Sequence, residues 1–179
     1  MIGGMMNPTQ LLDHIDIHGN MQVADFGSGM GHLTIAMAKR LAKSGTVHAF
    51  DVQKESLETL RRDARAEGVL NIQALWTDLE NPKSTKLADH SMDLVMIANV
   101  LFQSDAKDTI IAESARIVKP SGKVVVSDWS VESVFAGPPS SRRIPKDSMK
   151  ELFRKQQLHF VKEIPAGAHH YAMIFATHE

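Results

Sequence analysis

Hydrophobic and polar positions alternate between two periodicities along this 179-residue chain. Short apolar runs are followed by stretches in which apolar residues recur every three or four positions, a pattern that predicts strands followed by amphipathic helices. Strands are expected over residues 21–26, 46–50, 71–76, 92–98, 123–128, 159–164 and 170–177. Helices are expected from Asn7-Pro8 toward a stop at His18-Gly19-Asn20, and over residues 33–41, 54–67, 106–118 and 145–157.

The order of these elements indicates a mostly parallel α/β sheet that ends in a hairpin around residues 165–167. The nearly continuous apolar run at 92–98 indicates a strand that helices cover on both faces. In open sheets of this kind, ligands bind beyond the carboxyl ends of the strands. This rule selects a rim made of residues 25–31, 51, 76–79, 98–103 and 128–129.

The composition excludes several function classes. The sequence has no cysteine, so a disulfide framework, a thiolate metal site and a cysteine nucleophile are impossible. The formal net charge of −1 gives no global basic field that would attract nucleic acid, although a local basic patch stays compatible with it. No apolar run approaches the roughly 18 residues of a membrane span, and the start lacks the features of a signal peptide, so we expect a cytoplasmic protein.

A glycine-rich segment joins the first expected strand to its helix. Gly27, Gly29 and Gly31 follow the spacing G-x-G-x-G, and His32 comes next, so the phosphate-binding spacing G-x-G-x-x-G is not met. Asp25 precedes the first glycine by two residues, and its carboxylate would repel a pyrophosphate but suits a ligand that carries an ammonium group and a sulfonium charge. This pattern resembles that of class I S-adenosylmethionine-dependent methyltransferases.

The resemblance continues in order over residues 21–128. In this family an acid at the place of Asp51 binds both ribose hydroxyls, and an acid at the place of Asp78 often accepts a hydrogen bond from the adenine amino group. Each has a simpler alternative, since Asp51 could cap the helix over 54–67 and Asp78 could cap a short turn. The resemblance implies that S-adenosylmethionine, and the product S-adenosylhomocysteine, bind at Asp25, Gly27, Ser28, Gly29, Gly31, Asp51, Val52, Thr77, Asp78, Leu79 and Asn99.

Motifs further along the chain resemble a short branch of these enzymes, the ubiquinone/menaquinone-biosynthesis type. They are Asp128-Trp129, Gly137-Pro138-Pro139, Arg142 or Arg143, and Gly167-Ala168-His169-His170-Tyr171. Two departures are Ser28, where many relatives carry cysteine, and His169, where an aromatic residue is common; neither undermines cofactor binding. The resemblance implies a Rossmann-like seven-stranded sheet of order 3-2-1-4-5-7-6, with strand 7 antiparallel and helices on both faces.

We expect residues 1–179 to form a single methyltransferase domain, in which the N-terminal helix within 1–20 and the loop 129–145 shape the acceptor pocket. Asp128 and His170 are the candidate catalytic residues. Asp128 could accept a proton from the acceptor or hold a cation, or could instead be a buried acid that binds backbone N–H groups of the loop. His170 could act as a base near neutral pH, or pack against the loop through Asp128.

Three other polar residues are weaker candidates. Asn99 does not begin the Asn-Pro-Pro-aromatic motif of amino-methylases, because Val100-Leu101 replaces both prolines, yet it could line the pocket. His32 is interpreted as an exposed residue of the first helical turn rather than a ligand contact. Asp93 is interpreted as structural, because its end of the sheet faces away from the expected site.

Basic and metal-binding functions have little support. Arg142, Arg143 and Lys146 could bind an acidic group of the acceptor from the loop over the site. His169 and His170 point to opposite faces of one strand, which makes them a poor metal pair, and no metal site is expected.

The sequence therefore predicts methyl transfer from S-adenosylmethionine to an unidentified small-molecule acceptor. Two alternatives stay open: methylation of RNA or protein, and a cofactor-binding subunit without activity. RNA-methylating folds of this layout would need a lysine on strand five and an acid at the end of strand four, where this chain has Asp128 and Asn99. A monomer and a homodimer are both compatible with the sequence.

Overall fold

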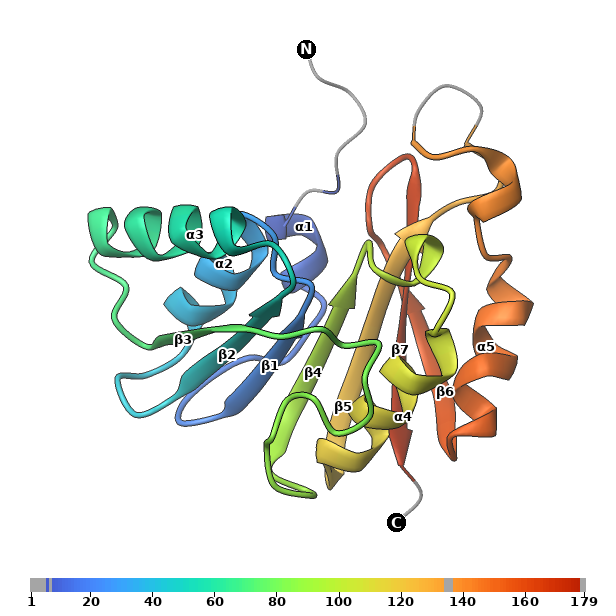
Figure 1. Ribbon diagram of the computed structural model, residues 1–179. Coiled ribbons are helices and arrows are strands. Elements are labelled where there is room, and N and C mark those ends of the chain that lie inside the picture. Colours follow the sequence, from blue (N-terminus) through green and yellow to red (C-terminus); the bar gives the residue numbers. More distant parts are fainter. Residues whose placement is uncertain (1–5, 7, 134–136, 178–179) are drawn as a thin grey trace.

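The computed structural model describes Met6 and residues 8–133 and 137–177 (Figure 1). Within these residues a seven-stranded sheet has the order β3-β2-β1-β4-β5-β7-β6. β7 is antiparallel to β5 and β6, and the other neighbouring pairs are parallel, which confirms the expected topology. The strands are β1 (Gln22–Phe26), β2 (Thr46–Asp51), β3 (Ile72–Trp76), β4 (Met92–Ala98), β5 (Val118–Trp129), β6 (Leu158–Ile164) and β7 (His170–Thr177).

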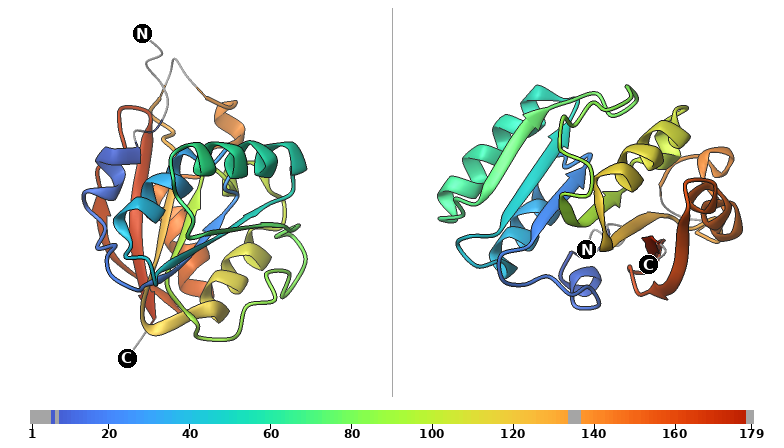
Figure 2. Two further views of the ribbon diagram at one scale, coloured as in Figure 1. Left: turned by 90° about the vertical axis from the view of Figure 1, so that its left-hand side faces the viewer. Right: turned by 90° about the horizontal axis from the view of Figure 1, so that it is seen from below.

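Helices cover both faces of the sheet, as Figure 2 shows. The first three helices pack on one face and the last two on the other. Their bounds are α1 (Pro8–Leu12), α2 (His32–Arg40), α3 (Lys54–Ala66), α4 (Lys107–Ile117) and α5 (Lys146–Lys155), and two short 3-10 segments are η1 (Leu101–Gln103) and η2 (Ser140–Arg142).

Side-chain alternation along the central strands supplies both cores. Val23 and Val125 pack in the cluster that contains α1 and α2, whereas Phe26 and Val126 pack in the cluster that contains α4 and α5. Residues 94–97 of β4 are buried in succession, because both sides of this strand face helices. The apolar run at 92–98 therefore reflects a strand that helices cover on both faces, as predicted.

The observed β5 begins at Val118, so the prediction that this strand begins at residue 123 was wrong, and Pro120-Ser121-Gly122 lies within it. Val118 already pairs with Met92, and the register shifts before Lys123 pairs with Leu94, so the intervening segment forms an irregular, bulge-like part of β5. A Cβ on Gly122 would lie 2.9 Å from the Asp93 carbonyl oxygen. The absent glycine side chain thus permits the close approach of two backbones.

The N-terminal helix is shorter than expected and ends at Leu12. Ile15 and Ile17 lie beyond it, yet both are buried in the same core as α1, so the apolar spacing reflects burial rather than helix. All other expected elements agree with the structure to within two residues. Among the described residues, no helix is both long enough and apolar enough to pass through a membrane.

Candidate active site

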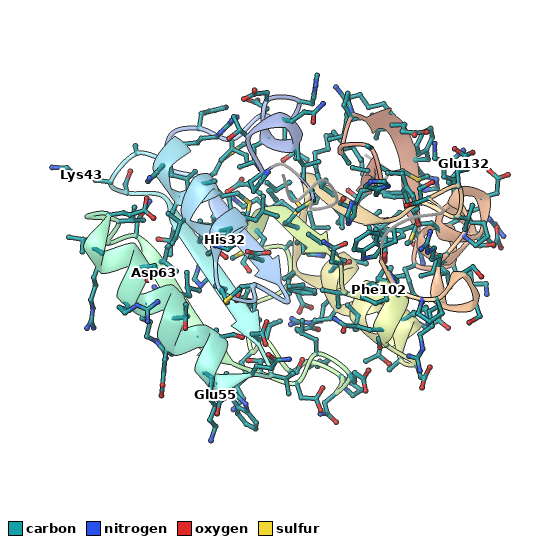
Figure 3. The ribbon with its side chains drawn as sticks, turned by 90° about the horizontal axis from the view of Figure 1, so that it is seen from above. His32, Lys43, Glu55, Asp63, Phe102 and Glu132 are labelled. Carbon is teal, nitrogen blue, oxygen red and sulfur yellow. The ribbon has the colours of Figure 1, made fainter. Side chains whose placement is uncertain are left out.

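A cleft of about 760 Å³ opens at the carboxyl ends of the strands. Figure 3 looks onto this end of the molecule, with His32 labelled at the start of α2 and Phe102 labelled in η1. The walls come from the glycine loop, the segments after β2, β3 and β4, and the first residues of β7. All eleven residues predicted to bind the cofactor line the cleft: Asp25, Gly27, Ser28, Gly29, Gly31, Asp51, Val52, Thr77, Asp78, Leu79 and Asn99.

The glycine loop is held by backbone hydrogen bonds and by close packing. The N–H groups of Gly27 and Ser28 donate to the Phe50 carbonyl at 2.8 and 3.0 Å, which ties the loop to β2. All three glycines have positive φ, a backbone conformation that other residues rarely adopt. A Cβ on Gly27 or Gly31 would collide with a neighbouring side chain, whereas a Cβ on Gly29 would meet nothing within 4 Å. Gly29 is therefore the glycine that borders open space.

Asp25 is the next-to-last residue of β1, and it is only 1% exposed. The hydroxyl of Thr34 in α2 donates to its carboxylate at 2.5 Å. Burial raises the pKa of Asp25 to about 6, against the effect of the Thr34 hydrogen bond and with a further increase from the charge of Asp51. A bound cation would favour the ionised carboxylate and so reverse part of this shift.

Asp51 uses its two carboxylate oxygens to accept backbone hydrogen bonds on opposite sides. Gly29 N–H donates to one oxygen at 2.7 Å, and Gln53 N–H donates to the other at 2.8 Å. Gln53, not Asp51, occupies the N-cap position of α3, so the alternative interpretation of Asp51 as the cap of this helix was wrong. Each oxygen can accept a second hydrogen bond, which leaves capacity for a diol at the cleft.

The segment after β3 forms the opposite wall. Thr77 N–H donates to the Asp51 carbonyl at 2.9 Å, which holds this segment beside β2. The carboxylate of Asp78 accepts from the Glu80 N–H at 3.0 Å and from the Asn81 side chain at 2.8 Å, so it does cap a short turn as the simpler alternative proposed. The buried Leu79 and the half-exposed Val52 add apolar surface to the cleft.

Asn99, His170 and Trp129 form a cluster at the other end of the cleft. The Nε2 atom of His170 lies 2.9 Å from Oδ1 of Asn99, a residue with φ of 58° at the end of β4. The imidazole also packs on the Trp129 ring, with 4.2 Å between the ring centroids. Burial lowers the pKa of His170 to about 4, with a smaller contribution from His169, so the ring is neutral at neutral pH.

Asp128 pairs with Tyr171, whose side chain packs in the core beneath α4 and α5. Asp128 therefore points to the opposite face of the sheet from Trp129 and His170, and it does not line the cleft. It is fully buried, and its carboxylate accepts the backbone N–H groups of Phe102 at 3.1 Å and Trp129 at 2.7 Å. Burial raises its pKa to about 6, while these N–H groups and Lys107 lower it. Its contacts match the second interpretation, that of a buried acid that satisfies backbone N–H groups. His170 has no hydrogen bond to it.

The basic residues of the loop are placed away from the cleft wall. Arg143 donates to the carbonyl groups of Ser130 and Pro138, both at 3.0 Å, and also to the carbonyl of Ser133, so it holds the loop together. Lys146 forms an ion pair with Glu163. Arg142 is exposed and does not line the cleft.

Two further predictions concern single residues. His32 is exposed, as expected, and it also lines the cleft. Asp93 accepts from the Gln22 N–H at 2.8 Å and pairs with Lys119 at 2.7 Å, which confirms its structural role away from the cleft. Across residues 8–133 and 137–177, no group of three or more His, Asp or Glu side chains is arranged to hold a metal ion.

Sequence reasoning missed part of the wall. Ser104 and Ile110 line the cleft, and the Ser104 hydroxyl donates to Glu80 at 2.7 Å across two connecting segments. These residues carry no motif, and only the fold brings them together. Ser28 is the opposite case: it was predicted, and its buried hydroxyl has no hydrogen-bond partner in the described structure.

Two similar proteins are named as methyltransferases. An arsenite methyltransferase from Aquipseudomonas alcaligenes is 33% identical over 111 residues, which is 60% of this chain and 32% of that protein. A ubiquinone/menaquinone biosynthesis C-methyltransferase from Cupriavidus pinatubonensis is 32% identical over 132 residues, which is 73% of this chain and 53% of that protein. The chain thus spans between a third and about half of the length of these relatives.

Solved structures show the same fold. A SAM-dependent methyltransferase from Aquifex aeolicus has a TM-score of 0.85 at 20% identity, with 96% of this chain and 89% of that chain covered. The [4+2]-cyclase SpnF has a TM-score of 0.75 at 16% identity, with 87% of this chain and 57% of that chain covered, so the fold alone does not define the reaction. A family model described as "Methyltransferase domain" matches residues 17–172, and the chain belongs to this family.

Proposed function

We propose that the cleft binds S-adenosylmethionine and that the protein transfers its methyl group to a small-molecule acceptor. The observation that carries this proposal is the charge of the cofactor end. Two carboxylates, Asp25 and Asp51, lie beside a glycine loop with open space at Gly29, and no lysine or arginine of the described chain lines the cleft. Such a site suits a cationic ligand with vicinal hydroxyls and opposes a pyrophosphate.

The residues present fit this cofactor. Asp25 would attract the ammonium group, and the unused acceptor capacity of Asp51 would receive the two ribose hydroxyls. The unpartnered hydroxyl of Ser28, buried at the cleft, would gain a polar partner on binding. Val52 and Leu79 would flank the adenine, and Asp78 can accept one more hydrogen bond from its amino group.

When bound, this cofactor supplies a methyl group that its sulfonium already activates. The contribution of the chain is then to align the acceptor and to exclude water, which together can provide most of the rate. Asn99 and His170 lie at the end of the cleft away from Asp51 and would face the acceptor. A base is needed only if the acceptor must lose a proton.

The acceptor end fits a small molecule better than a polymer. The cleft volume lies within the roughly 300–1,000 Å³ of pockets that take small ligands. Pro8 of α1 and Trp129 of β5 contribute to the wall, which supports the proposed role of segments 1–20 and 129–145 around the acceptor. The relatives named for arsenite and for quinones differ in their acceptors, and neither name is transferred to this chain.

Calorimetric titration with S-adenosylmethionine and S-adenosylhomocysteine, with NAD as a control ligand, tests the proposal. We expect micromolar binding of the first two and none of NAD. Asp51→Asn should weaken binding by about tenfold or more, because one carboxylate oxygen that would bind the ribose is replaced. Asp93→Asn is the matched control, since Asp93 is an acid at the other end of the sheet. Absence of binding, or preference for NAD, would overturn the proposal.

A further inference from the structure

The two ends of the cleft differ in charge. Its carboxylates all lie at the end formed after β1, β2 and β3: Asp25, Asp51, Asp78 and Glu80. The other end is formed by Asn99, Trp129 and His170, and Met6 and Pro8 also line the cleft. Among the cleft-lining residues that the structure describes, none is a lysine or an arginine.

Nearby cations do not supply the missing positive charge. Arg143 donates to loop carbonyls, and Lys146 is paired with Glu163. Lys107 of α4 donates to the Ser104 carbonyl and faces Asp128 on the other side of the sheet. The stretches 1–5 and 134–136, together with Asn7, contain no acidic or basic side chain in the sequence. An anionic acceptor would therefore find no counter-charge among these side chains and would meet four carboxylates in the same cleft, so only the sulfonium of the bound cofactor would attract it.

His170 gives this end of the cleft one hydrogen-bond acceptor, the ring nitrogen Nδ1. Because Nε2 faces the Asn99 side-chain oxygen, Nε2 carries the hydrogen and Nδ1 is the acceptor nitrogen. Nδ1 makes no hydrogen bond within residues 8–133 and 137–177, and this atom is not fully buried. The contact with Trp129 and the bond to Asn99, whose backbone is in the left-handed region, fix the ring in place.

We propose that this end of the cleft receives an uncharged acceptor that donates a hydrogen bond from oxygen or nitrogen to Nδ1 of His170, and that it rejects carboxylate and phosphate acceptors. This inference rests on the proposed function. As the methyl group is transferred, the carbon–sulfur bond breaks with its electron pair left on sulfur, and a carbon–oxygen or carbon–nitrogen bond forms. The proton of the acceptor passes to Nδ1 and from there to water. Asn99 is then a positioning residue, because it fixes which nitrogen of His170 accepts.

Matched ring compounds test the selection. The probes are phenol and aniline as uncharged donors, toluene as a ring without a donor, and benzoate and phenyl phosphate as acids. Binding to the protein saturated with S-adenosylhomocysteine is measured by saturation-transfer NMR and titration. This product lacks the sulfonium charge, so the selection reflects the side chains alone. We expect phenol and aniline to bind about tenfold or more tightly than either acid, and toluene to fall between.

Two variants locate the effect at His170. His170→Gln keeps a donor near the position of Nε2 for Asn99 but removes Nδ1, so it should weaken phenol and aniline binding about fivefold or more while toluene is unaffected. His169→Gln is the control, because His169 is the neighbouring residue and its Nδ1 lies 2.8 Å from the Ser133 hydroxyl, and it should leave all probes unchanged. Asn99→Ala should weaken the same two probes through loss of ring orientation, and Asn99→Gln should not restore them.

Calorimetry of each variant with S-adenosylhomocysteine separates the two proposals. If the unaltered protein does not bind S-adenosylhomocysteine, the proposed function itself is overturned. Intact product binding, combined with equal or tighter binding of benzoate or phenyl phosphate, would overturn this inference alone. Unchanged phenol and aniline binding in His170→Gln would also overturn it.

Discussion

Asp25 and Asp128 are two buried acids at the same edge of the sheet, and they differ in what they can do. Asp25 lies near the end of β1 and Asp128 near the end of β5, and burial raises the pKa of each to about 6. Asp25 lines the cleft and its one hydrogen bond comes from the Thr34 hydroxyl, whereas Asp128 binds two backbone N–H groups outside the cleft. Burial and a raised pKa are therefore shared by an acid that lines the cleft and an acid that does not, so the direction of the side chain and its unused acceptor capacity are the better guide to ligand binding.

Strand alternation explains the difference. Asp128 pairs with Tyr171, which packs in the core of α4 and α5, while the next pair, Trp129 and His170, faces the cleft. A shift of one residue in this register would exchange the two pairs. The acid at the end of β5 is thus turned away from the cleft by a single position.

The largest expected effect concerns cofactor affinity. Asp25→Asn should weaken S-adenosylmethionine binding by roughly 10- to 100-fold, because a charge-assisted contact to the ammonium group is lost. Asp128→Asn should change affinity by about twofold or less, since Asp128 does not contact the cleft. Calorimetry on both variants checks the comparison, which fails if they lose affinity equally.

The pH dependence of binding should follow Asp25. Its carboxyl is protonated below about pH 6 in the free protein, so affinity for S-adenosylmethionine should decrease as pH falls through 6. The charge of the neighbouring Asp51 contributes to the raised pKa of Asp25. Titrations between pH 5 and 8 should show the decrease in the native protein and a flat profile in Asp25→Asn. A decrease that persists in this variant would contradict the assignment.

The free energy of unfolding of the ligand-free protein should decrease as pH rises, whereas the affinity for the cofactor should increase. The folded protein holds the Asp25 proton more tightly than the unfolded chain, so the free energy of unfolding falls as pH rises from about 4 to 6. Asp25→Asn removes this loss and should stabilise the free protein by about 1–3 kcal/mol at pH 7. Asp128→Asn should stabilise less or destabilise, because an amide has one oxygen for two N–H donors. Urea unfolding at pH 4 and 7 measures both.

The smallest expected effect is the difference in stability between alanine variants of two glycines in the loop. Gly29→Ala adds strain at positive φ but meets no neighbour, so it should cost about 1 kcal/mol and leave the fold intact while it weakens cofactor binding. Gly27→Ala adds a clash with Val100 and should cost more than Gly29→Ala. Thermal unfolding ranks the two variants; the reverse order would contradict the packing described for the loop.

The fold and the cofactor end could be read from local sequence. Residues 92–98 predicted a doubly covered strand, and the glycine spacing with Asp25 and Asp51 marked the segments that line the cleft. Asn99, Trp129 and His170 were each expected near the pocket, but their mutual contacts could not be predicted, because the bond between Asn99 and His170 joins residues 71 positions apart across an intervening strand. The side to which Asp128 points depends on the pairing of β5 with β7, and no local pattern encodes it.

A crystal structure of the protein with S-adenosylhomocysteine would show whether Asp25 and Asp51 hold the cofactor. We expect the ammonium group beside Asp25, the ribose hydroxyls on Asp51 and the sulfur toward Asn99 and His170, with no contact to Asp128. A ligand bound elsewhere, or in this cleft with its ribose away from Asp51, would contradict the account.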